Sequence, residues 1–494
     1  MSVQKVLGIE TEYGIHVLGP NNNPTAASSL LINAYVNGLA SRVNWDFDDE
    51  APHRDARGFI HNGGMAPIVD SHLFNTVLTN GARYYVDHAH PEYSSPECST
   101  VLEALAYDRA GEVILQRSMA AASKLLPPGE EIVIYKNNSD GKGNSYGCHE
   151  NYLMARAIPF AQLARDFTPF LVTRQLFTGS GKVGCEEVGT QRSGFELTQR
   201  ADFFEEEVGL ETTMRRPIIN SRDEPHADPN SYRRLHVITG DANLAEVATL
   251  LKLGTSALML TMIEDGVFDA GNFALASPVK AMHDVSHDLA LSVKLELADG
   301  ATVTALELQW EIYELARTYA DSHGLSPLGP PAIGQLVLER WEQVLNGLEH
   351  DPTTLKDQLD WVAKYELINA YRERHNCGFD DPRISALDLQ YHDLRPDKSL
   401  FARLGTERLI DVAEVDAAVS NPPRTTRAYF RGECLRHFPE SIVAANWDSI
   451  IFDTGETALR RIPMMDPLRG SAAHVGTLFD ECKSPAELIA RLEG

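Results

Sequence analysis

Closely spaced cysteines are absent from this sequence of 494 residues. Its six cysteines are scattered along the chain, at Cys98, Cys148, Cys185, Cys377, Cys434 and Cys482. Disulfide frameworks and cysteine-based zinc modules both show cysteines at short, regular spacings. The spacing therefore predicts neither, and it is typical of a protein that works in a reducing cytoplasm.

Long apolar runs are also missing. The longest strongly apolar stretch, residues 255–263, is far shorter than the roughly 20 residues that a membrane-spanning helix needs. The first residues include Gln4, Lys5, Glu10 and Glu12, which do not fit the apolar segment of a targeting peptide. We expect a cytoplasmic protein with no membrane partner.

An excess of positive charge is missing as well. The formal net charge is −26, whereas nucleic-acid backbones are bound through clustered Lys and Arg. Nucleic acid is therefore not an expected partner. One basic stretch stands out, with Arg215, Arg216, Arg222, Arg233 and Arg234. Most of these are expected on the surface, although several that converged would bind phosphate groups.

The composition, with 43% apolar and 23% charged residues, is that of a globular protein long enough for two units. Strand patterns are expected over residues 5–17, 82–88, 131–135 and 234–238, with Asp241 capping the following helix. Helical patterns cover residues 26–41, 101–126 and much of the chain from 306 on. Prolines near residue 421 predict a boundary between a catalytic domain (1–420) and a small C-terminal domain (421–494). The fold class expected is α+β, with a curved antiparallel sheet backed by helices.

Residues 44–64 differ in kind from their surroundings. They hold four Asp and one Glu and show little periodicity. Long irregular segments in compact domains are usually functional lids or disordered. The pattern predicts a mobile insertion loop.

Alternation along the expected strands gathers charged residues on shared faces. Residues two apart on a strand point the same way. This spacing groups Glu10 with Glu12 on one expected strand, Arg83 with Tyr85 and Asp87 on a second, and Arg234 with His236 on a third. Any single strand of this kind fits an ordinary sheet with one solvated face. Two such strands side by side would instead concentrate carboxylates on one surface, as a Mg²⁺ site requires.

Two further segments have sequences that suggest a phosphate site. His149 follows a turn rich in Gly and Asn that could approach a phosphate closely. The stretch 178–182 (TGSGK) is superficially similar to a phosphate-binding loop, but it lacks the glycine spacing of that motif. We give it little weight.

Several longer motifs resemble the family of Pup ligases and Pup deamidases/depupylases. They are GIETEYG (8–14), NGAR (80–83), HPEY (90–93), KNN (136–138), GCHENYL (147–153), RDEPHAD (222–228), YRRLHV (232–237) and LDLQYHD (387–393). Pup is a small protein modifier that members of this family attach to, or remove from, lysines of target proteins. The resemblance implies a large domain similar in fold to glutamine synthetase, with ATP and Mg²⁺ as cofactors and with Pup and pupylated proteins as partners.

The resemblance also implies roles for individual residues. Asp87 occupies the position of the catalytic aspartate. The implied metal and phosphate shell is Glu10, Glu12, Tyr85, Glu92, His149 and His236. The implied nucleotide contacts are Arg83, Ser95, Arg222, Arg234 and, from the small domain, Trp447. At the position of Ser95 the ligases carry Thr, so this chain keeps only the hydroxyl group.

The family catalyses two opposite reactions, and the motifs favour hydrolysis. Residues 44–59 resemble a loop specific to the depupylase, as do the DHAHPE motif at 87–92 and the tail at 463–476. Cys148 and residues 170–176 are slightly closer to the ligase. We therefore expect a hydrolase that deamidates the C-terminal Gln of Pup and cleaves the Pup–lysine isopeptide bond. The alternatives are a Pup–protein ligase and a catalytically silent Pup-binding module.

Overall fold

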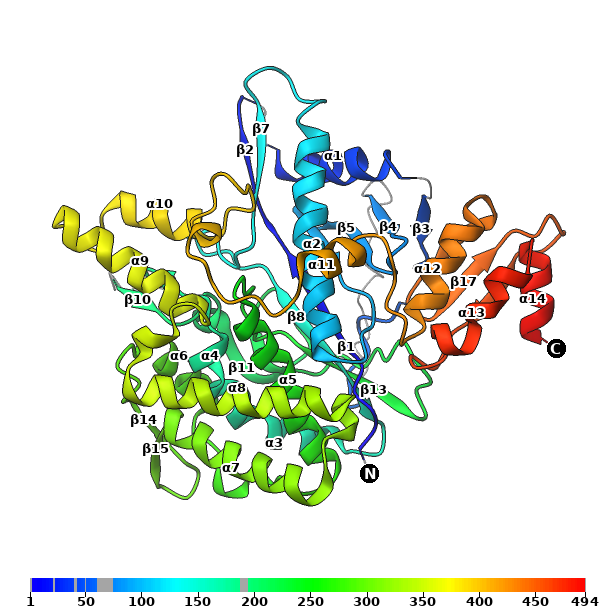
Figure 1. Ribbon diagram of the computed structural model, residues 1–494. Coiled ribbons are helices and arrows are strands. Elements are labelled where there is room, and N and C mark those ends of the chain that lie inside the picture. The colour runs from blue at the N-terminus through cyan, green and yellow to red at the C-terminus, as the bar shows by residue number, and fades with distance from the viewer. Residues whose placement is uncertain are drawn as a thin grey trace.

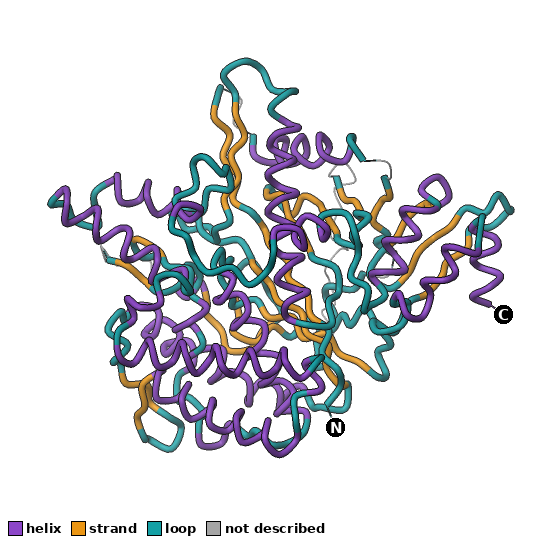
Figure 2. The backbone as a smooth tube through the Cα atoms, in the orientation of Figure 1, coloured by secondary structure: helices purple, strands orange, loops and turns teal. Residues whose placement is uncertain are grey.

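The computed structural model describes residues 2–20, 23–39, 42–48, 50–59, 74–186 and 194–493. Its centre is a ten-stranded sheet that crosses the molecule (Figures 1 and 2). The strand order is β13 (Tyr232–Val237), β8 (Cys148–Ala155), β1 (Leu7–Glu12), β6 (His90–Ser94), β5 (Arg83–Asp87), β4 (Asn75–Val77), β3 (Val43–Trp45), β16 (Ile442–Ala445), β17 (Ser449–Phe452) and β18 (Arg460–Pro463).

Neighbouring strands of this sheet are antiparallel, except that β3 and β16 run parallel. Four two-stranded sheets surround it in the described part of the chain. They are β2 (Gly14–Leu18) with β7 (Glu131–Tyr135), β9 (Lys182–Val183) with β10 (Phe195–Glu196), β11 (Phe204–Gly209) with β12 (Arg216–Asn220), and β14 (Lys294–Glu296) with β15 (Thr302–Thr304).

Helices cover one face of the sheet and extend to both sides of it (Figure 1). They are α1 (Pro24–Val36), α2 (Val101–Ala122), α3 (Phe160–Thr173), α4 (Gln175–Thr178), α5 (Glu246–Glu264), α6 (Pro278–His287), α7 (Ala305–His323), α8 (Pro331–His350), α9 (Asp360–His375), α10 (Pro382–Tyr391), α11 (Val412–Ala418), α12 (Ala428–His437), α13 (Ala472–Glu481) and α14 (Pro485–Glu493). The predicted α+β class is confirmed.

Alternating burial along the strands explains which face the helices cover. On β1, Leu7, Ile9 and Thr11 are buried, while Glu10 and Glu12 lie on the more accessible side. On β5, Tyr84 points to the helices and donates a hydrogen bond to Ser118 of α2. Because apolar side chains occupy the helix-facing side, the polar side chains gather on the opposite face, as the sequence predicted.

The predicted strand over residues 5–17 is wrong in one respect. The structure divides it at Tyr13 into β1 and β2, which pair in different sheets. Tyr13 is buried, and its backbone N–H donates to the Pro91 carbonyl, so the chain changes partners there. Alternation of residue type does not reveal a change of partner strand.

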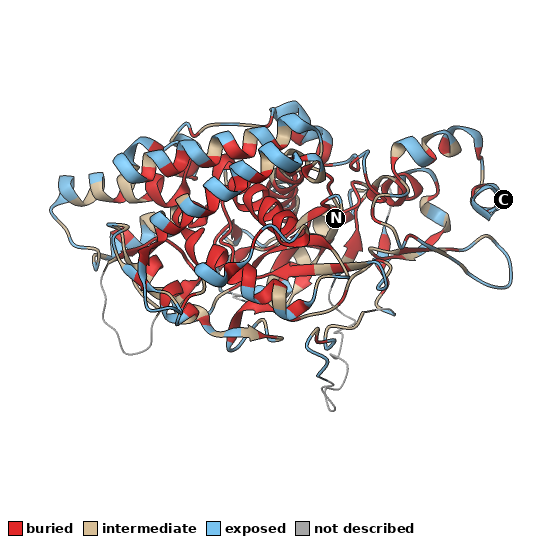
Figure 3. Ribbon diagram, turned by 90° about the horizontal axis from the view of Figure 1, so that it is seen from below, coloured by how far each residue is buried: buried red, intermediate tan, exposed pale blue. Residues whose placement is uncertain are grey.

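Helix α5 is fully buried, and its first residues correct one expectation. By length and composition this 19-residue helix could cross a membrane, yet all of it is buried within the protein (Figure 3). It begins at Glu246, and the backbone N–H groups of Leu244 and Ala245 donate to Asp360. Asp241 does not cap this helix, because its carboxylate accepts hydrogen bonds from Ser180 and Gln199 instead.

The C-terminal segment has its own hydrophobic cluster but shares the sheet. Phe430, Ile450 and Phe479 pack in a cluster that also includes Trp45 and Val77 from the N-terminal part. Strand β16 extends the main sheet by pairing with β3. The main sheet thus includes strands from both sides of residue 421. The division into two domains at this residue stays a prediction.

Candidate functional site

The accessible face of the sheet forms the floor of a cavity of about 470 Å³. We call it the active-site cavity. Its lining includes predicted site residues from five strands and from the connection between β12 and β13: Glu10, Glu12, Arg83, Tyr85, Asp87, Glu92, His149, Arg222 and His236. The structure thus brings these predicted residues together, although the role of each stays a prediction.

Strand register explains why they meet. Tyr85 lies opposite Glu92, which lies opposite Glu12, so these residues form one row across β5, β6 and β1. In the next row, Glu10 lies opposite His149. Cross-strand neighbours stand roughly 5 Å apart, close enough for several side chains to share a ligand.

Glu12, Asp87 and Glu92 form a cluster of three carboxylates. Each offers an oxygen within 4.8 Å of the others. Burial raises the pKa of Glu92 well above its ordinary value, and the charges of Asp87 and Glu12 raise it further. Like charges opposite each other destabilise a sheet. A divalent cation would neutralise them, so this donor set fits Mg²⁺.

Glu10, His149 and His236 form a second group of potential ligands, again with donor atoms within 4.8 Å. Burial lowers the pKa of His236 well below its ordinary value, so its imidazole is neutral and able to bind a metal. Burial tends to raise the pKa of Glu10, but its interactions with His149, His236 and Arg234 outweigh this effect, and the pKa lies well below the ordinary value. Glu10 is therefore an anion at neutral pH.

Tyr85 differs from the carboxylates around it. Burial raises the pKa of its phenol well above the usual value, and the charge of Glu92 adds to the effect. The hydroxyl group therefore keeps its proton and could offer a metal only a neutral oxygen.

Asp87 lies at the end of β5, beside His88. The Oδ2 atom of Asp87 is 3.0 Å from Nδ1 of His88, whose backbone has a positive φ of 52°. Their interaction raises the pKa of His88 to about 9. The pKa of Asp87 is lowered, because its interaction with His88 outweighs the opposing effect of burial. Asp87 is therefore a carboxylate at neutral pH, as a nucleophile or a base must be.

The guanidinium group of Arg83 is held between two aromatic rings. It lies 4.1 Å from the ring centre of Trp45 and 4.0 Å from that of Tyr85. Glu50 is 3.4 Å from Arg83 and accepts a hydrogen bond of 2.7 Å from the Trp45 indole. Such contacts fix a side chain that is otherwise mobile.

A smaller pocket of about 80 Å³ adjoins the cavity and shares Glu10 with it. It is lined by the remaining predicted residues, Ser95, Arg234 and Trp447. The hydroxyl group of Ser95 accepts a hydrogen bond from the backbone N–H of Ile9. Trp447 packs edge to face on Trp45, with ring centres 5.1 Å apart. The smaller pocket is therefore lined by residues of both the main sheet and the C-terminal segment.

The basic stretch near residue 220 divides between the site and the surface. Arg216 and Arg222 line the cavity, and Arg234 lies 3.6 Å from Glu10. Arg215 is exposed and contacts Glu206, and Arg233 lies over the ring of Phe160. Strand alternation separates Arg233 from Arg234.

Sequence reasoning missed several residues that line the cavity. They are Glu50, His88, His90, Tyr146, Arg200, Thr212 and Thr213. Arg200 is the most distant along the chain from the recognised motifs, and no periodic pattern marks it. The imidazole of His90 stacks on Tyr146 at 4.3 Å, a contact that only the tertiary structure creates.

Residues 44–64 are only partly a loop. Asn44 and Trp45 belong to β3, and Trp45 and Asp46 are buried. Asp55 pairs with Arg222 in an isolated β-bridge, and the Ala51 N–H donates to Glu224 at 2.5 Å. Residues 49 and 60–64 lie outside the described residues, so the predicted mobility there is untested. The described part is anchored beside the cavity.

Comparison with known proteins assigns a family to this arrangement. The model of the Pup-ligase protein family matches residues 5–451. The depupylase of Acidothermus cellulolyticus is 51% identical to the chain, with each covered over 100% of its length. The Pup deamidase/depupylase of Mycolicibacterium smegmatis is 48% identical, over 99% of this chain and 100% of the relative.

Ligases are more distant relatives. The Pup–protein ligase of Xylanimonas cellulosilytica is 37% identical, over 97% of this chain and 99% of the relative. A crystal structure of Pup with its ligase PafA superposes with a TM-score of 0.81 at 32% identity, covering 97% of this chain and 92% of that chain. A PafA structure in complex with ADP gives 0.74 at 35% identity, covering 82% and 90%. The chain, with its carboxylate-lined sheet, belongs to the Pup-ligase protein family.

Proposed function

We propose that this protein is an ATP- and Mg²⁺-dependent hydrolase that deamidates the C-terminal Gln of Pup and cleaves the Pup–lysine isopeptide bond. The observation that carries the proposal is the position of the ionised Asp87 carboxylate in a cavity beside Glu12 and Glu92. The direction of the reaction is supported by identities of 51% and 48% to depupylases, against 37% to a ligase. Its partners would be Pup and pupylated proteins, and its compartment the cytoplasm.

We assign the metal to the two groups of donors on the sheet. Glu10, Tyr85 and Glu92 would hold Mg²⁺ through their oxygen atoms. Glu12, His149 and His236 would be further members of the metal and phosphate shell. When bound, the metal would neutralise these carboxylates and polarise phosphate or carbonyl oxygens. The facing carboxylates support this assignment, because the buried Glu92 lies opposite Glu12 and a cation would offset the cost of that pairing.

We assign the nucleotide to the cavity and its adjoining pocket. Arg83, Arg222 and Arg234 would pair with phosphate oxygens, for which guanidinium groups are well suited. Ser95 and Trp447 would contact ATP from the smaller pocket. The PafA–ADP complex, a relative with the same overall fold, supports a nucleotide in this family.

Asp87 would carry the chemical step. Its carboxylate would either attack the amide carbonyl carbon or remove a proton from a water molecule that does so. In both routes the C–N bond breaks, the nitrogen leaves as ammonia or as the lysine amine, and a water molecule supplies the new carboxylate oxygen. His88, protonated beside Asp87, could donate a proton to the departing nitrogen.

The test is intact mass measurement of Pup substrates incubated with the enzyme, ATP and Mg²⁺. A hydrolase converts Gln-ended Pup to Glu-ended Pup and releases the target from a Pup conjugate. The matched control is Asp87→Asn, which should lower turnover by about 10²–10⁴-fold and leave ATP binding, measured by calorimetry, largely unchanged.

Two other outcomes would contradict the proposal. A new conjugate formed from Glu-ended Pup and a target lysine would identify a ligase. Binding of Pup and ATP without turnover of any of these substrates would identify a binding module.

A further inference from the structure

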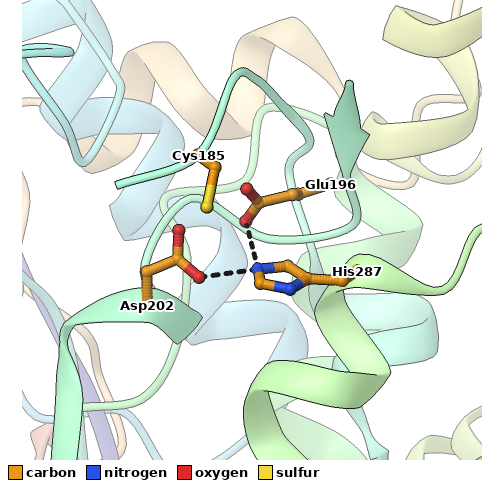
Figure 4. Close-up of side chains that lie close together, drawn as sticks. All are labelled: Cys185, Glu196, Asp202 and His287. Atoms are coloured by element: carbon orange, nitrogen blue, oxygen red, sulfur yellow. Dashed lines mark hydrogen bonds and ion pairs between the residues drawn. The ribbon is translucent and has the colours of Figure 1, made fainter. Parts of the chain in front are cut away.

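A second cluster of potential metal ligands lies around β9 and β10. It consists of Cys185, Glu196, Asp202 and His287, which we call the Cys185 cluster (Figure 4). Cys185 follows β9, Glu196 ends β10, Asp202 lies in the short helix η1 (Ala201–Phe203) and His287 ends α6. None of these residues lines the active-site cavity. Each offers a donor atom within 4.8 Å of the others.

Two carboxylates converge on one nitrogen of this cluster. The Nε2 atom of His287 lies 2.7 Å from Oδ1 of Asp202 and 3.4 Å from Oε2 of Glu196 (Figure 4). A ring nitrogen carries at most one hydrogen. It can therefore satisfy Asp202 but cannot also form a good hydrogen bond with Glu196.

Glu196 is the residue that points to a missing ligand. Its side chain is 5% exposed, and neither carboxylate oxygen has a hydrogen-bond partner. Its cationic neighbours are the His287 ring at 3.4 Å and Lys182 Nζ at 3.7 Å, both beyond hydrogen-bonding geometry. A buried carboxylate in this situation is costly. An ion among the four donors would remove the cost.

Hydrogen bonds to one carboxylate oxygen of Asp202 orient its other oxygen toward the cluster. Its Oδ2 atom accepts hydrogen bonds from the Glu186 N–H at 2.8 Å and from Lys182 Nζ at 3.3 Å. These contacts leave Oδ1, which faces the cluster, as the coordinating atom. Carboxylates that bind metals are commonly oriented in this way by outer hydrogen bonds.

The donor types select the class of metal. A thiolate, an imidazole and carboxylates suit Zn²⁺ and similar transition metals, whereas Mg²⁺ prefers oxygen ligands alone. The charges also balance: a divalent ion and Lys182 offset Cys185, Glu196 and Asp202 as three anions. Without a metal, protonated His287 and Lys182 would balance the two carboxylates, which leaves Glu196 without a hydrogen bond.

We propose that the Cys185 cluster is a structural binding site for Zn²⁺ or a closely similar transition-metal ion, separate from the Mg²⁺ site. Such an ion would join the β9–β10 hairpin, η1 and the end of α6. Asp202 lies two residues after Arg200, which lines the active-site cavity. The ion would therefore also hold the chain that carries Arg200. The scattered cysteines predicted no zinc site, and Cys185 with three residues distant in sequence makes no recognisable spacing.

The test is titration of Co²⁺ into the metal-stripped, full-length protein with Mg²⁺ in large excess, followed by optical absorption. A thiolate ligand gives a sulfur-to-cobalt charge-transfer band, and a four-ligand site gives intense visible bands. We expect one equivalent to bind with both signals, and Zn²⁺ to displace it. Cys185→Ser should abolish the charge-transfer band. Glu196→Gln should weaken binding by about 10-fold or more.

The matched control is Cys377→Ser, which removes another partly exposed thiol outside the cluster. It should bind Co²⁺ as the wild-type protein does. Circular dichroism checks that each variant folds. If Cys185→Ser does not fold, Glu196→Gln provides the test of the site in its place. The proposal is overturned if the wild-type protein binds no Co²⁺. It is equally overturned if the charge-transfer band survives loss of Cys185 or if Glu196→Gln binds as tightly as wild type.

Discussion

The carboxylate of Asp87 and the imidazole of His88, adjacent in sequence, face each other across 3.0 Å. Adjacent residues of a regular strand point to opposite faces. Here β5 ends at Asp87, and His88 takes a left-handed backbone with φ of 52°. The turn therefore brings a cation next to the proposed catalytic carboxylate, with a side chain that is 69% exposed.

This pair predicts a pH effect. The pKa of His88 is raised to about 9, so it is charged at neutral pH and helps to lower the pKa of Asp87. In His88→Gln that help is lost and the pKa of Asp87 rises. The acid limb of the kcat/KM profile should therefore move to higher pH. His88→Arg, which keeps the charge, should show a smaller move, and high salt should reduce the difference because His88 is exposed. An unchanged acid limb in His88→Gln would show that His88 does not lower the pKa of the group that limits activity at low pH.

The facing pair Glu12 and Glu92 predicts a stabilising effect of Mg²⁺. The pKa of Glu92 is raised above its ordinary 4.5, chiefly by burial. Because the pKa of Glu92 is higher in the folded protein than in the unfolded chain, Glu92 contributes its full stabilisation below pH 4.5. This contribution is lost as the pH rises through the folded-state pKa. Without Mg²⁺, Glu92→Gln should therefore be more stable than the wild-type protein at pH 8. This difference in stability should be smaller at pH 5.

Calorimetric melting in EDTA and in Mg²⁺ measures this effect. Mg²⁺ at about 100 times its Kd should stabilise the wild-type protein by about 2.7 kcal/mol, and Glu92→Gln by less. The exposed Glu456→Gln is the matched control and should behave as wild type. Equal gains from Mg²⁺ in wild type and Glu92→Gln would place the metal elsewhere.

A buried ion pair beneath the sheet predicts a large loss of stability. Arg174 and Glu150 are 1% and 0% exposed, and Arg174 Nη2 lies 2.6 Å from Glu150 Oε1. Arg174→Met leaves the Glu150 charge buried without its partner, which should cost about 3–5 kcal/mol in urea unfolding. Glu150→Leu with Arg174→Met should recover part of that loss.

An exposed pair supplies the control for this measurement. Arg317 and Glu314 are 56% and 52% exposed. Arg317→Met should therefore change stability by less than about 1 kcal/mol. If both Arg→Met variants lost the same free energy, the burial of Glu150 would not be the cause.

The contact of Glu50 with Arg83 predicts a kinetic effect of the loop. Glu50 is 29% exposed and Arg83 is 13% exposed. Glu50→Ala should release Arg83 and raise the KM for ATP several-fold, with little change in melting temperature. Trp45→Ala should instead cost about 3–5 kcal/mol, because Trp45 is a buried side chain of β3. Similar stability losses in the two variants would contradict this division.

The sequence by itself determined which residue types lie on the functional face. Alternation on β1 and β5 placed Glu10 with Glu12, and Arg83 with Tyr85 and Asp87, because strand geometry fixes which side chains share a face. Strand and helix patterns predicted the α+β class, and the family motifs then predicted the reaction. Local patterns such as these depend on neighbours a few residues apart, which the sequence displays directly.

The tertiary structure alone decided the contacts between distant segments. Only strand register sets Glu12 opposite Glu92, and only folding brings Asp360 to the start of α5 in place of Asp241. The break at Tyr13 and the Cys185 cluster likewise depend on which segments pack together. The free energy of such packing depends on the whole chain, so no local pattern of residues records it.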